Sequence, residues 1–228
     1  MQSIKKSSPK LTLNAEPDYL SLVTRFVEES AVVFGMSRDD YLGLHLAAEE
    51  IFLHLGSKLC PGEPIEIVCR DGVYYIRVQF IFTAPEMDMG GLNITSHADG
   101  PDDQDLEEMG LLIAARSVDH LNITLEGRNR ICLEVTKEKS YPRVSERLPS
   151  PAEPLPFTIE RPQDREIVKR FALRVYDCCK EGLFPPFFYH PGKVVDMIAG
   201  GEFDMLAALN RRRDVIAGVL FGNRAENI

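Results

Sequence analysis

The amino-acid sequence predicts an α+β protein: a mixed sheet with helices on one face, followed by a smaller and incomplete α/β domain. Two observations carry this prediction. Long segments in which apolar residues recur with helical spacing alternate with shorter runs rich in β-branched and aromatic residues. In the first half these segments follow the order strand, two helices, hairpin, helix and hairpin, which is typical of a sheet with its helices on one face.

The first half holds the longest predicted elements. The spacing of Leu22, Phe26 and Val33 indicates an amphipathic helix, and Ser37 is the expected N-cap of the next helix, whose first turn holds two aspartates. A turn at Asp71–Gly72 joins the strands of the first hairpin. The elements are a strand over 10–14, helices over 17–35 and 37–56, a hairpin over 64–82, a polar segment from Thr83 to about Glu108, a helix over 110–120 and a hairpin over 121–137.

A proline-rich segment separates the two halves. Residues 140–157 contain five prolines and would run extended, so we interpret them as a linker between domains 1–139 and 158–228. An irregular loop within a single domain is the alternative. The second half is predicted to hold a strand, a helix that begins at Pro162, an aromatic loop over 184–193, a second helix and two strands around a basic turn.

The charge and the lengths of the apolar runs argue against nucleic acid and membranes as partners. The formal net charge is −9, so the chain offers no basic face of the kind that binds nucleic acid. No apolar run approaches the ~20 residues that cross a bilayer, so we expect a cytoplasmic protein that does not bind membranes. The five cysteines form no C-x-x-C pair and are expected to be buried or unreactive thiols.

The segment LAAEEIFLHL, residues 46–55, carries the main candidate site. Glu49 and Glu50 are adjacent carboxylates, and His54 follows the second by one helical turn. From the residues alone, the first interpretation is the solvated edge of an amphipathic helix. A metal site is the alternative, because His45 and Glu49 have the same i, i+4 spacing as Glu50 and His54. The two pairs point in different directions, however, and no third ligand is evident.

Three motifs of the first half resemble those of a known family. They are AAEEIFLH, EEMGLLIAARSVD and the turn EGRNRICLEVTK, and through them residues 10–138 resemble the bacterial anti-sigma-factor serine kinases, a branch of the histidine-kinase-like ATPases. The resemblance implies an ATP site with Mg²⁺ beside Glu49 and Glu50. It also implies that Glu50 handles water or the acceptor hydroxyl, and that His54 stands where an asparagine holds the magnesium ion.

Departures from the family pattern predict a degenerate ATP site. His54 is a poor replacement for an amide at a hard cation that prefers oxygen ligands. Phe82 and Ala84 stand where the family has D-x-G, so the adenine amine loses its acceptor at a cost of roughly 1–3 kcal/mol. Glu108 replaces the first glycine of the phosphate-binding G-x-G, which leaves only Gly110.

The segment before Gly110 is strongly acidic as well. Residues 98–108, ADGPDDQDLEE, contain no basic side chain and would repel a triphosphate. Their aspartates lack the spacing of an EF-hand loop, so a solvated lid is preferred to a calcium site. We therefore expect ATP and Mg²⁺ to bind weakly or not at all.

The second half carries RPQD at its first helix and VIAGVLFG as its third strand. In this order of elements it is similar to the opening half of a GNAT-type N-acetyltransferase. That family holds acetyl-CoA on a glycine-rich loop that residues 158–228 do not contain, so no acetyl-CoA is expected for this chain. A sheet that stops at its third strand has an open edge, and pairing of that edge would give a homodimer.

One functional prediction and two alternatives follow. The prediction is a bacterial regulatory protein of the anti-sigma-factor type, which contacts a sigma factor or an anti-anti-sigma-like protein and has little or no kinase activity. The first alternative is an active ATP-dependent serine/threonine kinase, with Glu50 as the catalytic base and His54 serving the metal. The second is an N-acetyltransferase-related protein.

Overall fold

Two compact units make up the chain in the computed structural model. The N-terminal unit ends at Ser140 and the C-terminal unit begins at Tyr141. Each combines an antiparallel sheet with helices, so the chain is α+β as predicted. The structure describes residues 8–60, 62–83, 103–127, 129–144, 155–179 and 183–222. Two predicted site features, Ala84 and the side chain of Glu108, lie outside the described part.

One sheet and the helices that cover it form the described part of the N-terminal unit. The elements are β1 (Lys10–Asn14), η1 (Pro17–Tyr19), α1 (Leu20–Val33), α2 (Arg38–Lys58), β2 (Pro64–Asp71), β3 (Tyr75–Thr83), α3 (Asp103–Ser117), β4 (His120–Glu126) and β5 (Arg130–Glu138). The strand order is β1-β2-β3-β5-β4, and every described pairing is antiparallel, so the prediction of a mixed sheet is wrong. The physical reason is that two hairpins, β2–β3 and β4–β5, pair with each other through β3 and β5.

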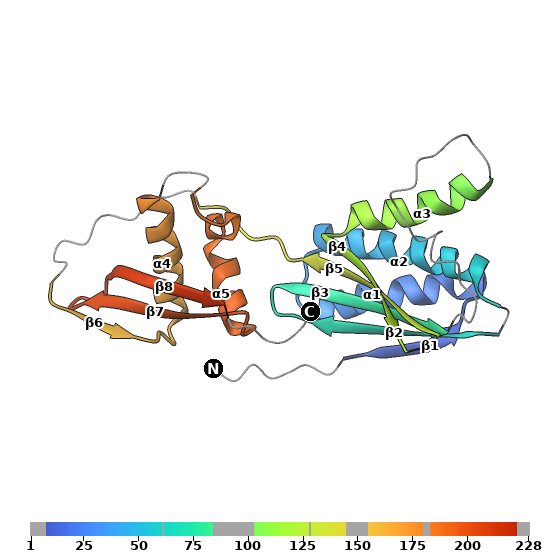
Figure 1. Cartoon of the computed structure of the whole chain (residues 1–228), viewed down its shortest axis with the longest axis horizontal. Coiled ribbons are helices and arrows are strands. Elements are labelled where there is room, and N and C mark those ends of the chain that lie inside the picture. Colours follow the sequence, from blue (N-terminus) through green and yellow to red (C-terminus); the bar gives the residue numbers. More distant parts are fainter. Residues whose placement is uncertain are drawn as a thin grey trace. The chain divides into compact units, whose positions relative to one another are not determined.

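The three helices lie on one face of this sheet (Figure 1). Val78 and Phe80 of β3 are fully buried in the core on that face. Arg77 and Gln79 alternate with them and lie on the other face, where both contact Glu134 of β5. A site built from α2 and α3 therefore lies in the helical layer, above the hydrophobic core.

Helix α1 forms as predicted, and Phe26 packs against the core, but two of the three apolar residues that predicted the helix are not on its buried face. Leu22 and Val33 are 50% and 67% exposed, whereas Val23, Val27 and Ala31 are buried. Both sets have helical spacing and differ by a rotation of about 100°. The buried set has the smaller side chains, which let α1 pack closely on α2. Sequence periodicity alone does not distinguish the two faces.

Helix α3 begins earlier than predicted. It starts at Asp103 rather than at Gly110, so the last part of the expected polar segment is helical. Negative charge is favourable in the first turn of a helix, and this stretch of sequence is acidic. Gly110 consequently lies inside α3, and not in a loop that leads into it.

The C-terminal unit also has an antiparallel sheet. Its described elements are β6 (Phe157–Glu160), α4 (Arg165–Cys178), η3 (Pro186–Tyr189), α5 (Pro191–Ala199), β7 (Phe203–Asn210) and β8 (Val215–Gly222). The strand order is β6-β7-β8, and α4 and α5 cover one face of the sheet (Figure 1). The prediction of an α/β domain is corrected to α+β here, because both strand pairings are antiparallel: β7 and β8 form a hairpin, and β6 pairs with β7 after a connection that contains α4 and α5.

The chain enters the C-terminal unit through Tyr141. Its hydroxyl group donates a hydrogen bond of 2.7 Å to the carboxylate of Asp196 on α5. Its carbonyl oxygen lies 2.8 Å from Nδ1 of His190. The start of the predicted linker thus packs on α5, and residues 145–154 of that linker lie outside the described part of the chain.

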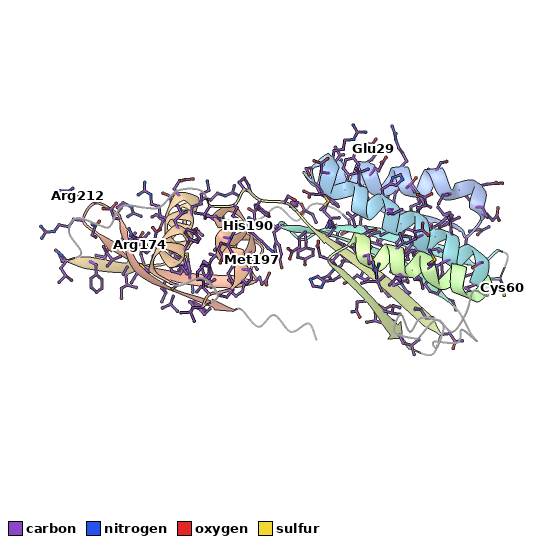
Figure 2. The ribbon with its side chains drawn as sticks, turned by 90° about the horizontal axis from the view of Figure 1, so that it is seen from above. Glu29, Cys60, Arg174, His190, Met197 and Arg212 are labelled. Atoms are coloured by element: carbon purple, nitrogen blue, oxygen red, sulfur yellow. The ribbon has the colours of Figure 1, made fainter. Side chains whose placement is uncertain are left out.

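The five cysteines are free thiols. Cys69 and Cys132 are buried, and burial raises the pKa of Cys69 to about 12. Its thiol is therefore protonated and unreactive at neutral pH, as expected for a buried cysteine. Cys60, just beyond the end of α2, is exposed (Figure 2).

Candidate functional site

The structure brings together two of the predicted site residues, Glu50 of α2 and Gly110 of α3. A Cβ atom added at Gly110 would lie 2.9 Å from Oε2 of Glu50, closer than real side chains approach. Glycine therefore lets the Glu50 carboxylate lie against the backbone of α3. The resemblance to the anti-sigma-factor kinases implies a phosphate oxygen at this glycine, whereas the oxygen atom found there belongs to the protein itself.

A second close approach joins the same two helices. A Cβ atom added at Gly43 of α2 would lie 2.3 Å from the carbonyl oxygen of Ser117 on α3. Gly43 precedes Glu50 by seven residues (50 − 43), and Ser117 follows Gly110 by seven (117 − 110), so α2 and α3 pack antiparallel. We call these two contacts the α2–α3 seam. Each helix contributes one glycine to it.

The seam places the carboxyl group of Glu50 in an unfavourable electrostatic environment. Burial raises the pKa of Glu50 above its ordinary value, and the neighbouring charge of Glu49 raises it further. A group whose pKa is raised by folding contributes stability below its unfolded pKa and loses that contribution as the pH rises through its folded pKa. Ionised Glu50 therefore destabilises the folded unit at neutral pH.

Replacing Glu50 with glutamine is expected to raise the free energy of unfolding at pH 7 by less than about 1 kcal/mol, because the amide keeps the shape of the side chain and removes its charge. The gain should disappear below the ordinary glutamate pKa of 4.5, where Glu50 is protonated in both states. Urea unfolding at both pH values measures the difference. Glu29→Gln is the matched control: the side chain of Glu29 on α1 is exposed, so this variant should not raise the free energy of unfolding (Figure 2). A loss of stability at pH 7 in the Glu50 variant would show that the charge is favourable.

Glu49 serves a different contact from Glu50. Its Oε2 lies 3.8 Å from Nε2 of His45, whose Nδ1 lies 3.1 Å from Oε1 of Glu28 on α1. The two adjacent carboxylates thus have different neighbours: Glu49 lies beside His45 of its own helix, which contacts Glu28 of α1, whereas Glu50 lies against α3. Among the described residues, no group of three histidine, cysteine or acidic side chains has an arrangement that could hold a metal ion.

His54 and Phe82 are both buried, with 7% and 3% of their surface exposed. Phe82 belongs to the hydrophobic core beneath the helices, where its ring packs with the aliphatic side chains of the sheet. An aromatic residue in that place stabilises the fold by burying apolar surface. The phenyl ring of Phe82 presents no polar acceptor to the amine of an adenine.

The buried aspartate at the start of α2, Asp40, joins this helix to Ser140 as well as taking part in the helix cap. Asp40 is 8% exposed, and its carboxylate accepts hydrogen bonds from the hydroxyl groups of Ser37 and Ser140 and from the backbone N–H of Ser140. Burial alone would raise the pKa of Asp40, but these hydrogen bonds outweigh it and lower the pKa. The Ser37-x-x-Asp40 spacing signals a helix cap, whereas Ser140 is 100 positions away and carries no local signal.

The fold and the site thus define an α+β protein whose helical layer is closed by the α2–α3 seam. Comparison with known proteins finds no family model that matches the chain and no curated protein that is similar to it. None of the helices in the described part of the chain is long and apolar enough to span a membrane.

Proposed function

We propose that this chain is a regulatory protein of the anti-sigma-factor type, which acts by protein contact and has no significant kinase turnover. The N-terminal unit supplies the frame of a histidine-kinase-like ATPase domain, and its nucleotide site has lost the groups that hold Mg²⁺ and ATP. The partner is a sigma factor or an anti-anti-sigma-like protein.

The contact between Glu50 and Gly110 is the observation that carries the loss of ATP binding. The backbone of a phosphate-binding glycine must be open to an anion. Here Gly110 lies inside a helix, and a carboxylate of the same protein occupies the space beside it. An anionic phosphate brought to this place would meet the charge of Glu50 and hydrogen-bonded helical N–H groups.

The outer face of α2 supports action by protein contact. Leu42, Leu46 and Leu53 are 50%, 37% and 40% exposed. Their spacings of four and seven residues put them on one face of the helix. A row of large apolar side chains on a surface helix is typical of a surface that binds another protein. We assign the partner-binding role to this leucine row.

An active serine/threonine kinase is the second candidate, and one observation favours it. The raised pKa of Glu50, due to burial and to Glu49, is the property that suits a general base. Under this candidate, Glu50→Ala abolishes phosphorylation of a partner protein. Under the first, the wild-type chain already transfers no phosphate.

Titration of the full chain with a fluorescent ATP analogue and Mg²⁺ tests the proposed function. We expect no saturable binding in the micromolar range. The variant His54→Asn restores the amide of the family pattern, and it should bind no better because the seam stays closed. Magnesium-dependent binding below the micromolar range by the wild-type chain, followed by phosphate transfer to an antagonist protein, would overturn the proposal in favour of the kinase.

A further inference from the structure

The sheet of the C-terminal unit has one face that α4 and α5 do not cover. Its orientation is fixed by alternation along β7, where Met205, Ala207 and Leu209 are buried toward the helices. Gly218 of β8 lies on the same inner face, because a Cβ atom there would lie 2.7 Å from the ring of Phe171 on α4. The residues between these positions must therefore lie on the opposite face.

That opposite face carries large apolar side chains on all three described strands, with Asp204 beside Phe221 at one end. Its large side chains are Phe157 and Ile159 of β6, Leu206 of β7, and Val219 and Phe221 of β8, which are 47%, 66%, 39%, 60% and 37% exposed. Strand register places them together, because Ile159 pairs with Ala208, Ala208 with Ala217, and Leu206 with Val219. We call these residues the outer face of the C-terminal sheet.

We propose that the outer face of the C-terminal sheet is a homodimer interface, in which the sheets of two copies pack face to face. Five side chains at these exposures present on the order of 500 Å² of apolar surface, which is at the upper end for a monomer. Two such faces together bury on the order of 1,000 Å², the lower limit for a specific interface. The small pair Ala208–Ala217 leaves room for a bulky side chain from the facing sheet, as interdigitating sheet cores require.

The charges at the two ends of the sheet determine the direction of packing. The turn between β7 and β8 carries Arg211, Arg212 and Arg213, with Arg212 at its tip (Figure 2). The other end of the same strands carries Glu202 and Asp204. Asp204 forms an ion pair with Arg161, and Arg213 of the basic turn forms one with Glu160. The packing direction is therefore inferred from Glu202 at one end and from Arg211 and Arg212 at the other. A two-fold axis perpendicular to the strands brings the basic end of one copy over the acidic end of the other. A two-fold axis along the strands would oppose like charges, so the strands of the facing sheets run antiparallel.

Sedimentation equilibrium of the full chain tests the interface. The wild-type chain is expected to dimerise, and Ile159→Lys and Val219→Lys are expected to weaken the dimer by more than about tenfold because each places a charge in the buried face. Both positions are exposed in one copy, so the variants should fold, which the unchanged circular dichroism spectrum would confirm. Leu125→Lys is the matched control, because Leu125 is 58% exposed on β4 of the N-terminal unit and should leave the dimer intact.

A charge exchange tests the direction of packing. Arg212→Glu and Glu202→Arg should each weaken the dimer, and the double variant should restore it, because the two residues meet across the two-fold axis. A wild-type chain that stays monomeric, or a dimer that Ile159→Lys and Val219→Lys leave unchanged, would overturn the proposal. A dimer that these two variants weaken but the charge exchange does not restore would overturn the antiparallel arrangement. None of these outcomes depends on ATP binding, so they are separate from the test of the proposed function.

Discussion

Replacing Gly43 with alanine is expected to lower the free energy of unfolding of the N-terminal unit by about 2 kcal/mol, although alanine is a better helix former than glycine by about 1 kcal/mol. The added Cβ atom would lie 2.3 Å from the carbonyl oxygen of Ser117, which is backbone and cannot rotate away. Helices α2 and α3 must therefore move apart by about 1 Å, which loosens the contacts along the seam. Urea unfolding followed by hydrogen exchange of peptides from α2 and β3 reports on this unit alone.

Gly110→Ala is the matched comparison on the other helix of the seam. Its Cβ atom would meet the end of the Glu50 side chain, which is flexible and can rotate away. The variant is therefore expected to be unchanged or more stable by up to about 1 kcal/mol, through its higher helix propensity. If Gly43→Ala and Gly110→Ala lowered the free energy of unfolding equally, the packing described for the seam would be contradicted.

Replacing Asp40 with alanine is expected to lower the free energy of unfolding at pH 7 by about 3 kcal/mol, because hydrogen bonds to a buried carboxylate are lost and their donors are left inside the protein. Folding lowers the pKa of Asp40, so its contribution is complete above the unfolded value of 3.8 and is lost as the pH falls through the folded value. The difference between wild type and variant should therefore shrink in acid below pH 3.8. Urea unfolding across this pH range measures it.

Asp39→Ala provides the control for Asp40. Asp39 stands next to Asp40 in the first turn of α2, but its side chain is exposed. Only its interaction with the helix dipole is lost, which is worth about 0.3–1 kcal/mol. Similar losses in the two variants would show that Ser140 does not hold Asp40 in the way described.

Local signals in the sequence predicted much of the fold. Ser37 caps α2 as expected, since its side chain accepts a hydrogen bond from the backbone N–H of Asp40. The hairpins β2–β3 and β4–β5 also form where the turn residues indicated. These features depend on neighbours within a few positions, which is why sequence patterns reveal them.

The features that the sequence did not reveal depend on distant partners. The buried face of α1 is decided by the fit of Val23 and Val27 against α2, and Leu22 offers an equally good periodicity. The structural role of Gly110 could not be read from the sequence for a similar reason. A glycine permits a phosphate loop and a close helix contact equally well, and only the approach of Glu50 distinguishes them.

The central claim is that the α2–α3 seam occupies the place of a nucleotide cleft, and hydrogen exchange of the backbone amides around Gly110 tests it most directly. Amides inside a packed helix exchange slowly, whereas those of an open phosphate loop exchange fast until a nucleotide binds. We predict slow exchange at Gly110 and Leu111 without nucleotide, and the same rates at saturating Mg²⁺ and ATP. Fast exchange that becomes slow when Mg²⁺ and ATP are added would contradict the claim.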